Sequence, residues 1–298
     1  MAPLRWRRAP YRRHCVISYL KKIHLIGFLA KLLSLKSLMD TQQLTNILQV
    51  DNLNVFYGSF QAVKDVSFYV KQGEIFGLLG PNGAGKTSTL SAVEGLIKQQ
   101  SGTVIVAGYD TLKNPLHAKA AMGVQLQATS FQPELNVSEI LQLYASLYGL
   151  NLTQEKLTAL LKEINLAEAE NKKFGQLSGG QQQRVSLAIT TIHDPKLVLL
   201  DEPTSGLDPQ SRRQLWSRID AIREKGHGVV LTTHSMEEAE AVCDRISIID
   251  HGRIIATDTP QALIDKHRDD PEVIAVSRRG KVTLEDVFIA LTGLDIRG

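Results

Sequence analysis

Cysteine is scarce in this sequence, and its histidines are not spaced for metal binding. The 298 residues contain two cysteines, Cys15 and Cys243, too few and too far apart for a disulfide framework or a zinc site. The eight histidines show no metal-ligand spacing. These absences exclude a disulfide-stapled secreted domain and a zinc domain, and a reducing compartment is the simplest interpretation.

The sequence also lacks an uncharged apolar run of about 18 residues, the length that spans a bilayer as a helix. The nearest segment, residues 15–39, is interrupted by Lys21, Lys22, Lys31 and Lys36. Its apolar residues follow helical spacing, which predicts an amphipathic helix. We therefore expect that this chain does not cross a membrane by itself.

Acidic residues are absent from residues 1–38, which hold nine Lys and Arg. The rest of the chain holds 25 Lys and Arg against 31 Asp and Glu, so its net charge is about −6, although the whole chain carries +3. An acidic body argues against general nucleic-acid binding. For residues 1–38 three interpretations stay open: a membrane-surface anchor, an organellar targeting peptide, or a stretch upstream of a true start at Met39.

The pattern of the body predicts an α/β fold. Residues 47–58 and 60–73 alternate as antiparallel strands do, and apolar strands then recur between helical segments. The later strands are expected at 74–80, 101–108, 195–203, 228–234 and 245–258, with helices at 137–150, 153–166 and 211–226. Strands that alternate with helices predict a mainly parallel sheet, and the helical stretch near 130–175 predicts an inserted lobe.

Residues 80–87, GPNGAGKT, fit the pattern G-x-x-x-x-G-K-[ST] between a predicted strand and a predicted helix. The glycines let the chain curl so that successive N–H groups face phosphate oxygens. Lys86 is expected to reach the β- and γ-phosphates, and the Thr87 hydroxyl to bind Mg²⁺. A purely structural glycine turn would not account for both the residues and their context. The motif predicts a P-loop NTPase, a class with many unrelated activities.

Three polar residues end apolar strands and are expected at the same edge of the sheet. Asp201 ends LVLLD, where its carboxylate can hold the Mg²⁺ shell. Glu202 follows at once, placed to orient or deprotonate a water near the γ-phosphate, and His234 ends VVLTTH. Alone, an Asp-Glu pair is commonly a solvated strand exit and a single histidine is usually structural. The P-loop in the same chain favours the functional interpretation.

Two further residues are weaker candidates. A glutamine follows the short strand in MGVQLQ, and the pattern alone does not choose between Gln125 and Gln127. Tyr57, before the predicted turn at Gly58, either stacks on adenine or belongs to the core.

A second glycine-rich segment, LSGGQQQRV, occupies residues 177–185. Ser178 is a good N-cap, and Gly179 and Gly180 leave N–H groups free at the positive end of the predicted helix. The segment lies beyond the helical lobe, where it need not fold back onto residues 80–87. The alternative is a capped helix start without a ligand.

In their order along the chain, these motifs resemble those of the ATP-binding cassette (ABC) ATPases: GPNGAGKT, a strand ending in glutamine, LSGGQ, LLDEP, SGLD and a strand-end histidine. The resemblance covers about residues 47–262. It implies a RecA-like core with a mainly parallel sheet, an antiparallel β-subdomain and a helical subdomain at about 128–185. The expected division is a basic extension (1–38), the ATPase domain (46–262) and a short C-terminal extension (263–298).

The resemblance also assigns roles to individual residues. In this family LSGGQ binds the ATP of another cassette, so two copies, head to tail, would enclose two ATP molecules. Gln127 rather than Gln125 would sense the γ-phosphate, His234 would brace it, and Asp208 would communicate across the dimer. The implied ATP contacts are Tyr57, Gly80, Pro81, Asn82, Gly83, Ala84, Gly85, Lys86, Thr87, Ser88, Ser178, Gly179, Gly180, Gln181 and Asp208. The implied Mg²⁺ ligands are Thr87, Gln127 and Asp201, and the implied catalytic residues are Glu202, His234 and Gln127.

With one cassette and no membrane span, the chain resembles the separate ATPase subunit of a transporter. Such a subunit would act as a homodimer, or paired with a related ATPase subunit, at the cytoplasmic face of the inner membrane, beneath permease subunits that select the cargo. Residues 282–293, VTLEDVFIALTG, resemble the end of drug-resistance-type exporter ATPases, where a helix follows a short linker. The alternatives are an importer ATPase and a non-transport ABC protein; no nucleic-acid partner is expected.

Overall fold

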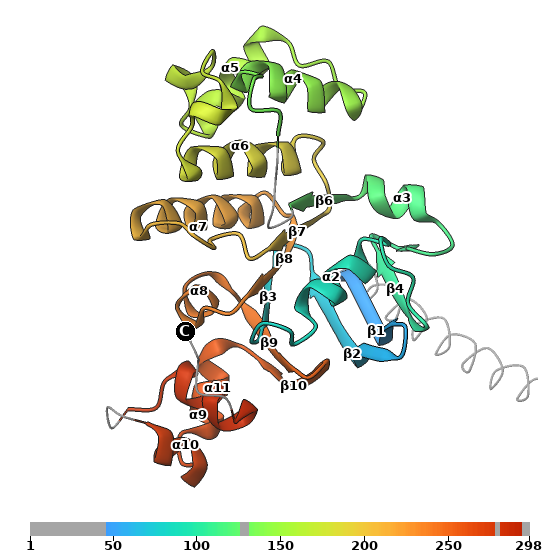
Figure 1. Cartoon of the computed structure of the whole chain (residues 1–298), viewed down its shortest axis with the longest axis vertical. Coiled ribbons are helices and arrows are strands. Elements are labelled where there is room, and N and C mark those ends of the chain that lie inside the picture. The colour runs from blue at the N-terminus through green and yellow to red at the C-terminus, as the bar shows by residue number, and fades with distance from the viewer. Residues whose placement is uncertain (1–45, 126–130, 278–280, 294–298) are drawn as a thin grey trace, which may run out of the picture. The chain divides into compact units, whose positions relative to one another are not determined.

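The computed structural model describes residues 46–125, 131–277 and 281–293 (Figure 1). Residues 1–45 are not among them, so the expected amphipathic helix and Met39 lie outside the described residues. No helix in the described ranges is long and apolar enough to cross a membrane.

A sheet of six strands forms the centre of the fold, in the order β10-β9-β3-β8-β7-β6. The strands β3 (Ile75–Leu79), β6 (Met122–Gln125), β7 (Leu197–Asp201), β8 (Gly228–Thr233) and β9 (Arg245–Asp250) are parallel, and β10 (Arg253–Asp258) pairs antiparallel with β9. Every residue of β3, β7 and β8 is buried, as expected for strands covered on both faces. Because the strands are parallel, their carboxyl ends share one edge. The predicted α/β fold is confirmed.

The second sheet is antiparallel, in the order β2-β1-β4-β5. Its strands are β1 (Asn46–Tyr57), β2 (Phe60–Lys71), β4 (Ser101–Val106) and β5 (Tyr109–Asp110). Burial alternates along the second half of β2, so one face contacts the core and the other faces solvent. Its strands β1 and β2 are the antiparallel pair that the period-2 pattern predicts, and the sheet is the β-subdomain that the family resemblance implies.

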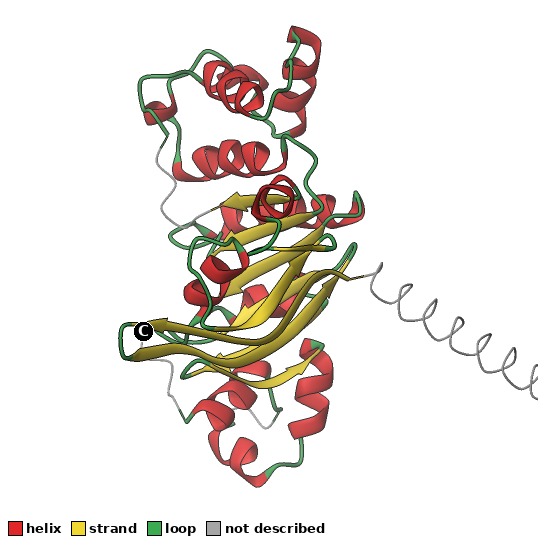
Figure 2. Cartoon of the chain, turned by 90° about the vertical axis from the view of Figure 1, so that its right-hand side faces the viewer, coloured by secondary structure: helices red, strands yellow, loops and turns green. Residues whose placement is uncertain are grey.

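Two apolar layers lie on opposite faces of the central sheet (Figure 2). On one face, α2 (Lys86–Val93) and the antiparallel sheet pack against Phe76, Leu78 and Leu199. On the other, α6 (Gly179–Thr191), α7 (Pro209–Glu224) and α8 (Met236–Val242) contribute to a core with Ile75, Leu79 and Leu200. The short α3 (Pro115–Ala120) leads into β6.

The inserted lobe has a hydrophobic core of its own. It contains α4 (Val137–Leu147), α5 (Gln154–Glu163) and the 3₁₀ turns η1 (Ala167–Ala169) and η2 (Phe174–Gln176), which pack with Val185, Ala188 and Ile189 of α6. The predicted capping box between Asn136 and Glu139 begins α4. The helix α6 continues to Thr191, so it passes through residue 185, where the sequence placed the end of the helical subdomain.

The C-terminal segment contains three helices rather than a linker and one helix: α9 (Pro260–His267), α10 (Pro271–Val276) and α11 (Leu284–Thr292). The expected boundary between residues 262 and 263 falls inside α9. Leu263, Leu284 and Phe288 are buried in the same core as α7 and α8, so the described part of this segment packs onto the ATPase domain.

Candidate functional site

The loop from β3 to α2 curls tightly around three glycines. Gly83 and Gly85 have φ values of +83° and +103°, and Gly85 occupies the N-cap of α2 without a side-chain cap. A Cβ on Gly80 would lie 2.3 Å from the carbonyl oxygen of Ile249, so no side chain fits there. The first turn of α2 therefore presents its N–H groups without a capping side chain, as an anion site requires.

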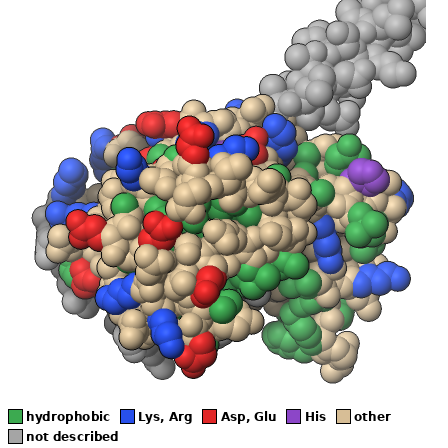
Figure 3. Space-filling model, turned by 90° about the horizontal axis from the view of Figure 1, so that it is seen from above, with side chains coloured by type: hydrophobic (Ala, Val, Ile, Leu, Met, Phe, Trp, Pro, Cys, Tyr) green, Lys and Arg blue, Asp and Glu red, His purple; other side chains and the backbone are tan. Residues whose placement is uncertain are grey.

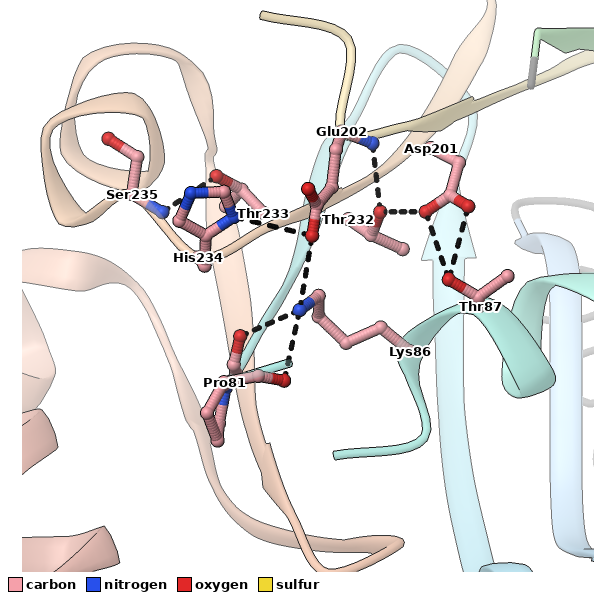
Figure 4. A network of polar contacts seen from close by, with 10 residues as sticks. Pro81, Lys86, Thr87, Asp201, Glu202, Thr232, Thr233, His234 and Ser235 are labelled. Carbon is pink, nitrogen blue, oxygen red and sulfur yellow. Dashed lines mark hydrogen bonds and ion pairs between the residues drawn. The ribbon is translucent and has the colours of Figure 1, made fainter. Parts of the chain in front are cut away.

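Lys86 extends from this first turn back along the loop (Figure 4). Its Nζ donates to the carbonyl oxygens of Gly80 (2.8 Å) and Pro81 (3.1 Å) and lies 3.3 Å from Glu202 Oε1. The side chain is 5% exposed. Burial lowers the pKa of the ammonium group, and the Glu202 and Asp201 carboxylates oppose that shift.

Asp201 ends β7 beside Thr87, the second residue of α2 (Figure 4). Thr87 Oγ1 lies 3.1 Å from Asp201 Oδ2, so a hydroxyl and a carboxylate from elements far apart in the sequence meet at one point. Thr232, paired with Asp201 across the β7–β8 ladder, donates its hydroxyl hydrogen to the other carboxylate oxygen. Hard oxygen donors of this kind suit Mg²⁺.

Glu202 has a left-handed backbone conformation, with φ of +46°. Its N–H donates to Thr232 Oγ1 (3.0 Å) and to the Thr232 carbonyl oxygen (3.2 Å), which hold the turn. Its Oε1 lies 3.3 Å from His234 Nδ1 as well as from Lys86 Nζ. The carboxylate is therefore held between two nitrogen groups at the carboxyl edge of the sheet.

Tyr57 lies near this loop and is not a core residue. Its side chain is 49% exposed at the end of β1, and its hydroxyl donates to Ser88 Oγ at 3.4 Å. An exposed ring beside the first turn of α2 agrees with the adenine-stacking interpretation.

The signature segment, residues 177–181, begins α6. Ser178 and Gln181 form a capping box in which Ser178 Oγ accepts from the Gln181 N–H, and Gln181 Oε1 accepts from the Ser178 N–H. The N–H groups of Gly179 and Gly180 have no hydrogen-bond partner within the described ranges. No hydrogen bond or ion pair between described residues joins this segment to residues 80–88.

Asp208 lies beside the signature segment instead. It caps α7 by accepting from the Gln210 and Ser211 N–H groups, and it accepts from Ser211 Oγ at 2.6 Å. These hydrogen bonds, the Ser211 hydroxyl foremost, lower the pKa of the Asp208 carboxyl. A Cβ built on Gly180 would lie 2.6 Å from Ser211 Oγ, so the first turns of α6 and α7 touch.

The predicted residues therefore form two groups. Lys86, Thr87, Asp201, Glu202 and His234 meet at the P-loop, whereas the signature segment and Asp208 meet at the start of α6 and α7. Gln127 lies outside the described residues. Sequence reasoning missed Thr232, although the position of VVLTTH beside LVLLD in a parallel sheet is a signal that could have found it.

The loop between a buried strand and a helix, with Lys86 and Thr87 in the first turn and Asp201 on a parallel strand, defines a P-loop NTPase. Comparisons with known proteins narrow the class. The family model described as "ABC transporter" matches residues 63–205. The linearmycin resistance ATP-binding protein LnrL of Bacillus subtilis is 40% identical over 222 residues, 74% of this chain and 71% of that protein. The Nod factor export ATP-binding protein I of Burkholderia orbicola is 35% identical over 83% of this chain and 97% of its own length.

Solved structures agree. The ATP-binding subunit of an ABC transporter is similar, with a TM-score of 0.71 and 28% identity over 82% of this chain and 99% of that one. A nucleotide-free ATP-binding cassette matches with a TM-score of 0.67 at 23% identity over 77% of this chain and 97% of that one, a likeness of fold alone. The chain belongs to the ABC transporter ATP-binding protein family; it is an ATP-binding subunit of the transporter class and an ATPase.

Proposed function

We propose that two copies of the chain close head to tail on two Mg·ATP molecules and drive a separate permease, in the direction of export. The observation that carries this proposal is the separation of the two phosphate-binding helix starts. The P-loop group holds the hydrolytic residues, and the signature segment, with free N–H groups at Gly179 and Gly180, packs against α7. A second copy supplies the nucleotide that this segment faces.

In this proposal each chain holds one ATP by its P-loop. N–H groups of the loop and of the first turn of α2 surround the phosphates, Lys86 contacts the β- and γ-phosphates, and Tyr57 stacks on the base. Thr87 Oγ1 and Asp201 Oδ2, 3.1 Å apart, would hold Mg²⁺ together with Gln127, and the metal would neutralise charge on the phosphates. Ser178, Gly179, Gly180 and Gln181 of the partner complete the site.

Glu202 has the position of the general base. It follows Asp201 directly, and its backbone N–H makes two hydrogen bonds to Thr232. These bonds fix the backbone of Glu202 and so the direction in which its side chain leaves the loop. It orients a water and accepts its proton as the water attacks the γ-phosphate. His234 Nδ1 lies 3.3 Å from Glu202 Oε1, so His234 holds this carboxylate and braces the γ-phosphate.

The γ-phosphate contacts make the dimer a switch. Moving an equilibrium from 1:99 to 99:1 in favour of closure needs roughly 5.5 kcal/mol of differential binding. A hydrogen bond to a charged group contributes about 1.5–3 kcal/mol, so a few contacts across two sites suffice. ADP cannot make them, so hydrolysis opens the dimer.

An exposed hydrophobic surface supports a permease partner. It comprises Leu112 and Leu116 near α3, Val124 on β6, and Leu147 and Tyr148 at the end of α4. Tyr148 stacks on His193 at 3.9 Å, and His193 Nε2 lies 3.0 Å from the Met122 carbonyl oxygen, which places the end of α4 near β6. In Figure 3, hydrophobic side chains gather on the side that carries α3, whereas charges of both signs are scattered over the other side. A contiguous apolar surface favours a protein partner.

The names of the relatives support the direction. One relative is named for Nod factor export, an outward process, and another for linearmycin resistance. Membership in a family of transporter ATP-binding subunits supports our proposal that the chain is a peripheral subunit on the cytoplasmic face of the inner membrane, beneath its permease. Identification of the proteins that co-purify with the chain distinguishes export from import. A permease alone supports export, whereas an importer would also require a substrate-binding protein.

Glu202→Gln tests the proposal. Glutamine keeps the size of the side chain and removes the proton acceptor, a loss of roughly 10²–10⁴ in rate for general-base catalysis. The variant should bind Mg·ATP and elute as a stable dimer in size-exclusion chromatography, whereas the wild type with ADP elutes as a monomer.

A second substitution separates the two halves of the site. Ser178→Arg in the Glu202→Gln background should bind ATP with unchanged affinity and stay monomeric, because arginine displaces the partner's nucleotide. A Glu202→Gln variant that hydrolyses ATP at the wild-type rate, or binds ATP and remains monomeric, contradicts the proposal.

A further inference from the structure

The segment that joins the two groups of residues is the loop from Glu202 to Asp208, between β7 and α7. It contains two successive turns, closed by hydrogen bonds from the Ser205 N–H to the Glu202 carbonyl oxygen (3.1 Å) and from the Leu207 N–H to that of Thr204 (3.2 Å). Pro203 is buried. The loop thus has a defined conformation, and what it rests on determines where the Glu202 carboxylate lies.

At its start the loop rests on α6. Gln183, in the turn that follows the signature segment, donates from Nε2 to the carbonyl oxygen of Pro203 at 2.5 Å, and the contact is partly buried. Thr232 holds the Glu202 N–H from the β8 side. The loop is therefore held on both sides of Glu202 by two different elements, β8 at the Glu202 N–H and α6 at the carbonyl of Pro203, one residue later.

At its end the loop rests on the same helix. Gly180 contacts Ser211 so closely that a Cβ would lie 2.6 Å from Ser211 Oγ and 3.0 Å from Ser211 Cβ. The Ser211 hydroxyl in turn donates to Asp208, which caps α7. The start of the loop thus contacts α6 directly through Gln183, and its end contacts the first turn of the same helix through Ser211 of α7.

We propose that Gln183 is a positioning residue that ties the Glu202 carboxylate of a chain to that chain's own signature segment. The inference rests on the proposed head-to-tail dimer, in which the signature segment binds the partner's ATP. Because one helix carries both contacts, docking of α6 on the partner's nucleotide sets the Glu202 loop that serves the chain's own ATP. Hydrolysis at one site is thereby conditional on occupancy of the other.

Gln183→Met tests this inference in the full-length chain, since methionine has a similar length and no N–H donor. Loss of one hydrogen bond to the loop should lower kcat roughly 3- to 10-fold, while the KM for ATP stays within about twofold. Dimer formation by the Gln183→Met/Glu202→Gln double variant should equal that of Glu202→Gln alone, because closure does not require the carboxylate. Gln183→Lys, which restores a donor of similar reach, should regain part of the lost kcat.

Gln182→Met is the matched control. Gln182 lies next along the same helix, and its Nε2 donates to the carbonyl oxygens of Phe174 (3.2 Å) and Leu177 (3.4 Å), which belong to the helical lobe and the signature segment rather than the Glu202 loop. It should keep the wild-type kcat. The inference is wrong if Gln183→Met keeps kcat within twofold, or if Gln182→Met loses as much. If Glu202→Gln without a second substitution fails to dimerise, the proposed function is wrong and this inference with it.

Discussion

Single residues outside the recognisable motifs determine how the site is assembled. Thr232 is fully buried and bonds Asp201 through its hydroxyl hydrogen while accepting the Glu202 N–H through its oxygen. One hydroxyl group therefore orients both the predicted Mg²⁺ ligand and the predicted base. Removal of this hydroxyl would take one hydrogen bond from the buried Asp201 carboxylate and one of two from the Glu202 N–H.

Glu94 is a second buried polar residue, and it makes stability depend on pH. It caps the C-terminus of α2, is 4% exposed, and its Oε1 has no hydrogen-bond partner in the described part of the chain. Burial, assisted by the Asp201 charge and opposed by Lys119, raises the pKa of Glu94 to about 7. The folded state thus retains a proton that the unfolded state releases near pH 4.5.

We predict that Glu94 destabilises the fold as pH rises. The contribution of Glu94 to the free energy of unfolding is greatest below about pH 4.5 and falls between pH 4.5 and 7. Above pH 7 it is constant, and the total fall is at most about 3 kcal/mol. Glu94→Gln should therefore gain free energy of unfolding relative to the wild type between pH 4.5 and 8, measured by urea unfolding without nucleotide. The exposed Glu240→Gln is the control and should show no such gain. If the free energies of unfolding of Glu94→Gln and the wild type differ by the same amount at pH 4.5 and at pH 8, the raised pKa of Glu94 is contradicted.

At the scale of elements, the contact between α6 and α7 gives the adjacent glycines Gly179 and Gly180 different surroundings. A Cβ on Gly180 would meet Ser211 at 2.6 Å, whereas a Cβ on Gly179 would meet nothing within 4 Å. Neither glycine has a positive φ, so the difference between them is one of space. Gly180 permits the close approach of the two helix starts, whereas Gly179 faces open space.

Gly180→Ala should lower the free energy of unfolding by about 1–3 kcal/mol, because the new methyl group displaces Ser211 from Asp208. Gly179→Ala should change it by about 1 kcal/mol or less. Addition of Ser211→Gly to Gly180→Ala removes the clashing atoms, so a double-mutant cycle should show a favourable coupling of about 0.5–3 kcal/mol. Equal effects of the two alanine substitutions, or a coupling of zero, would show that the helices do not meet as described.

At the scale of the whole molecule, the P-loop group and the proposed partner surface occupy different places. The P-loop group lies at the carboxyl edge of the central sheet, and the exposed hydrophobic surface lies around α3, β6 and the end of α4. Partner binding should therefore be separable from ATP hydrolysis by substitution.

Leu147→Glu should abolish stimulation of the ATPase by the co-purifying permease while leaving the basal rate and the unfolding midpoint unchanged. The side chain is 71% exposed, so a charge costs the isolated chain little, but it costs several kcal/mol when buried unpaired against an apolar partner. Ile274→Glu on α10, at a residue 53% exposed and outside that surface, is the matched control and should remain stimulated. Co-purification and stimulation that survive Leu147→Glu would place the permease elsewhere.

The sequence by itself determined the class and the family, because both depend on local patterns. GPNGAGKT specifies a curled loop whatever surrounds it, apolar runs specify buried parallel strands, and the polar residues at their ends must meet at one edge. For this reason Lys86, Thr87, Asp201, Glu202 and His234 were predictable as one group, and the helices at 137–150 and 153–166 appear as α4 and α5.

Only the tertiary structure decided the contacts that depend on the relative position of distant elements. The bond from Gln183 to Pro203, the approach of Gly180 to Ser211 and the double role of Thr232 join residues 20 to 31 positions apart, and no local period predicts them. The same holds for the C-terminal segment, where the burial of Leu263 against the core places α9 across the expected boundary. Side-chain contacts between elements depend on register and on the rotation of each helix, and both are set by the complementary fit of the whole core.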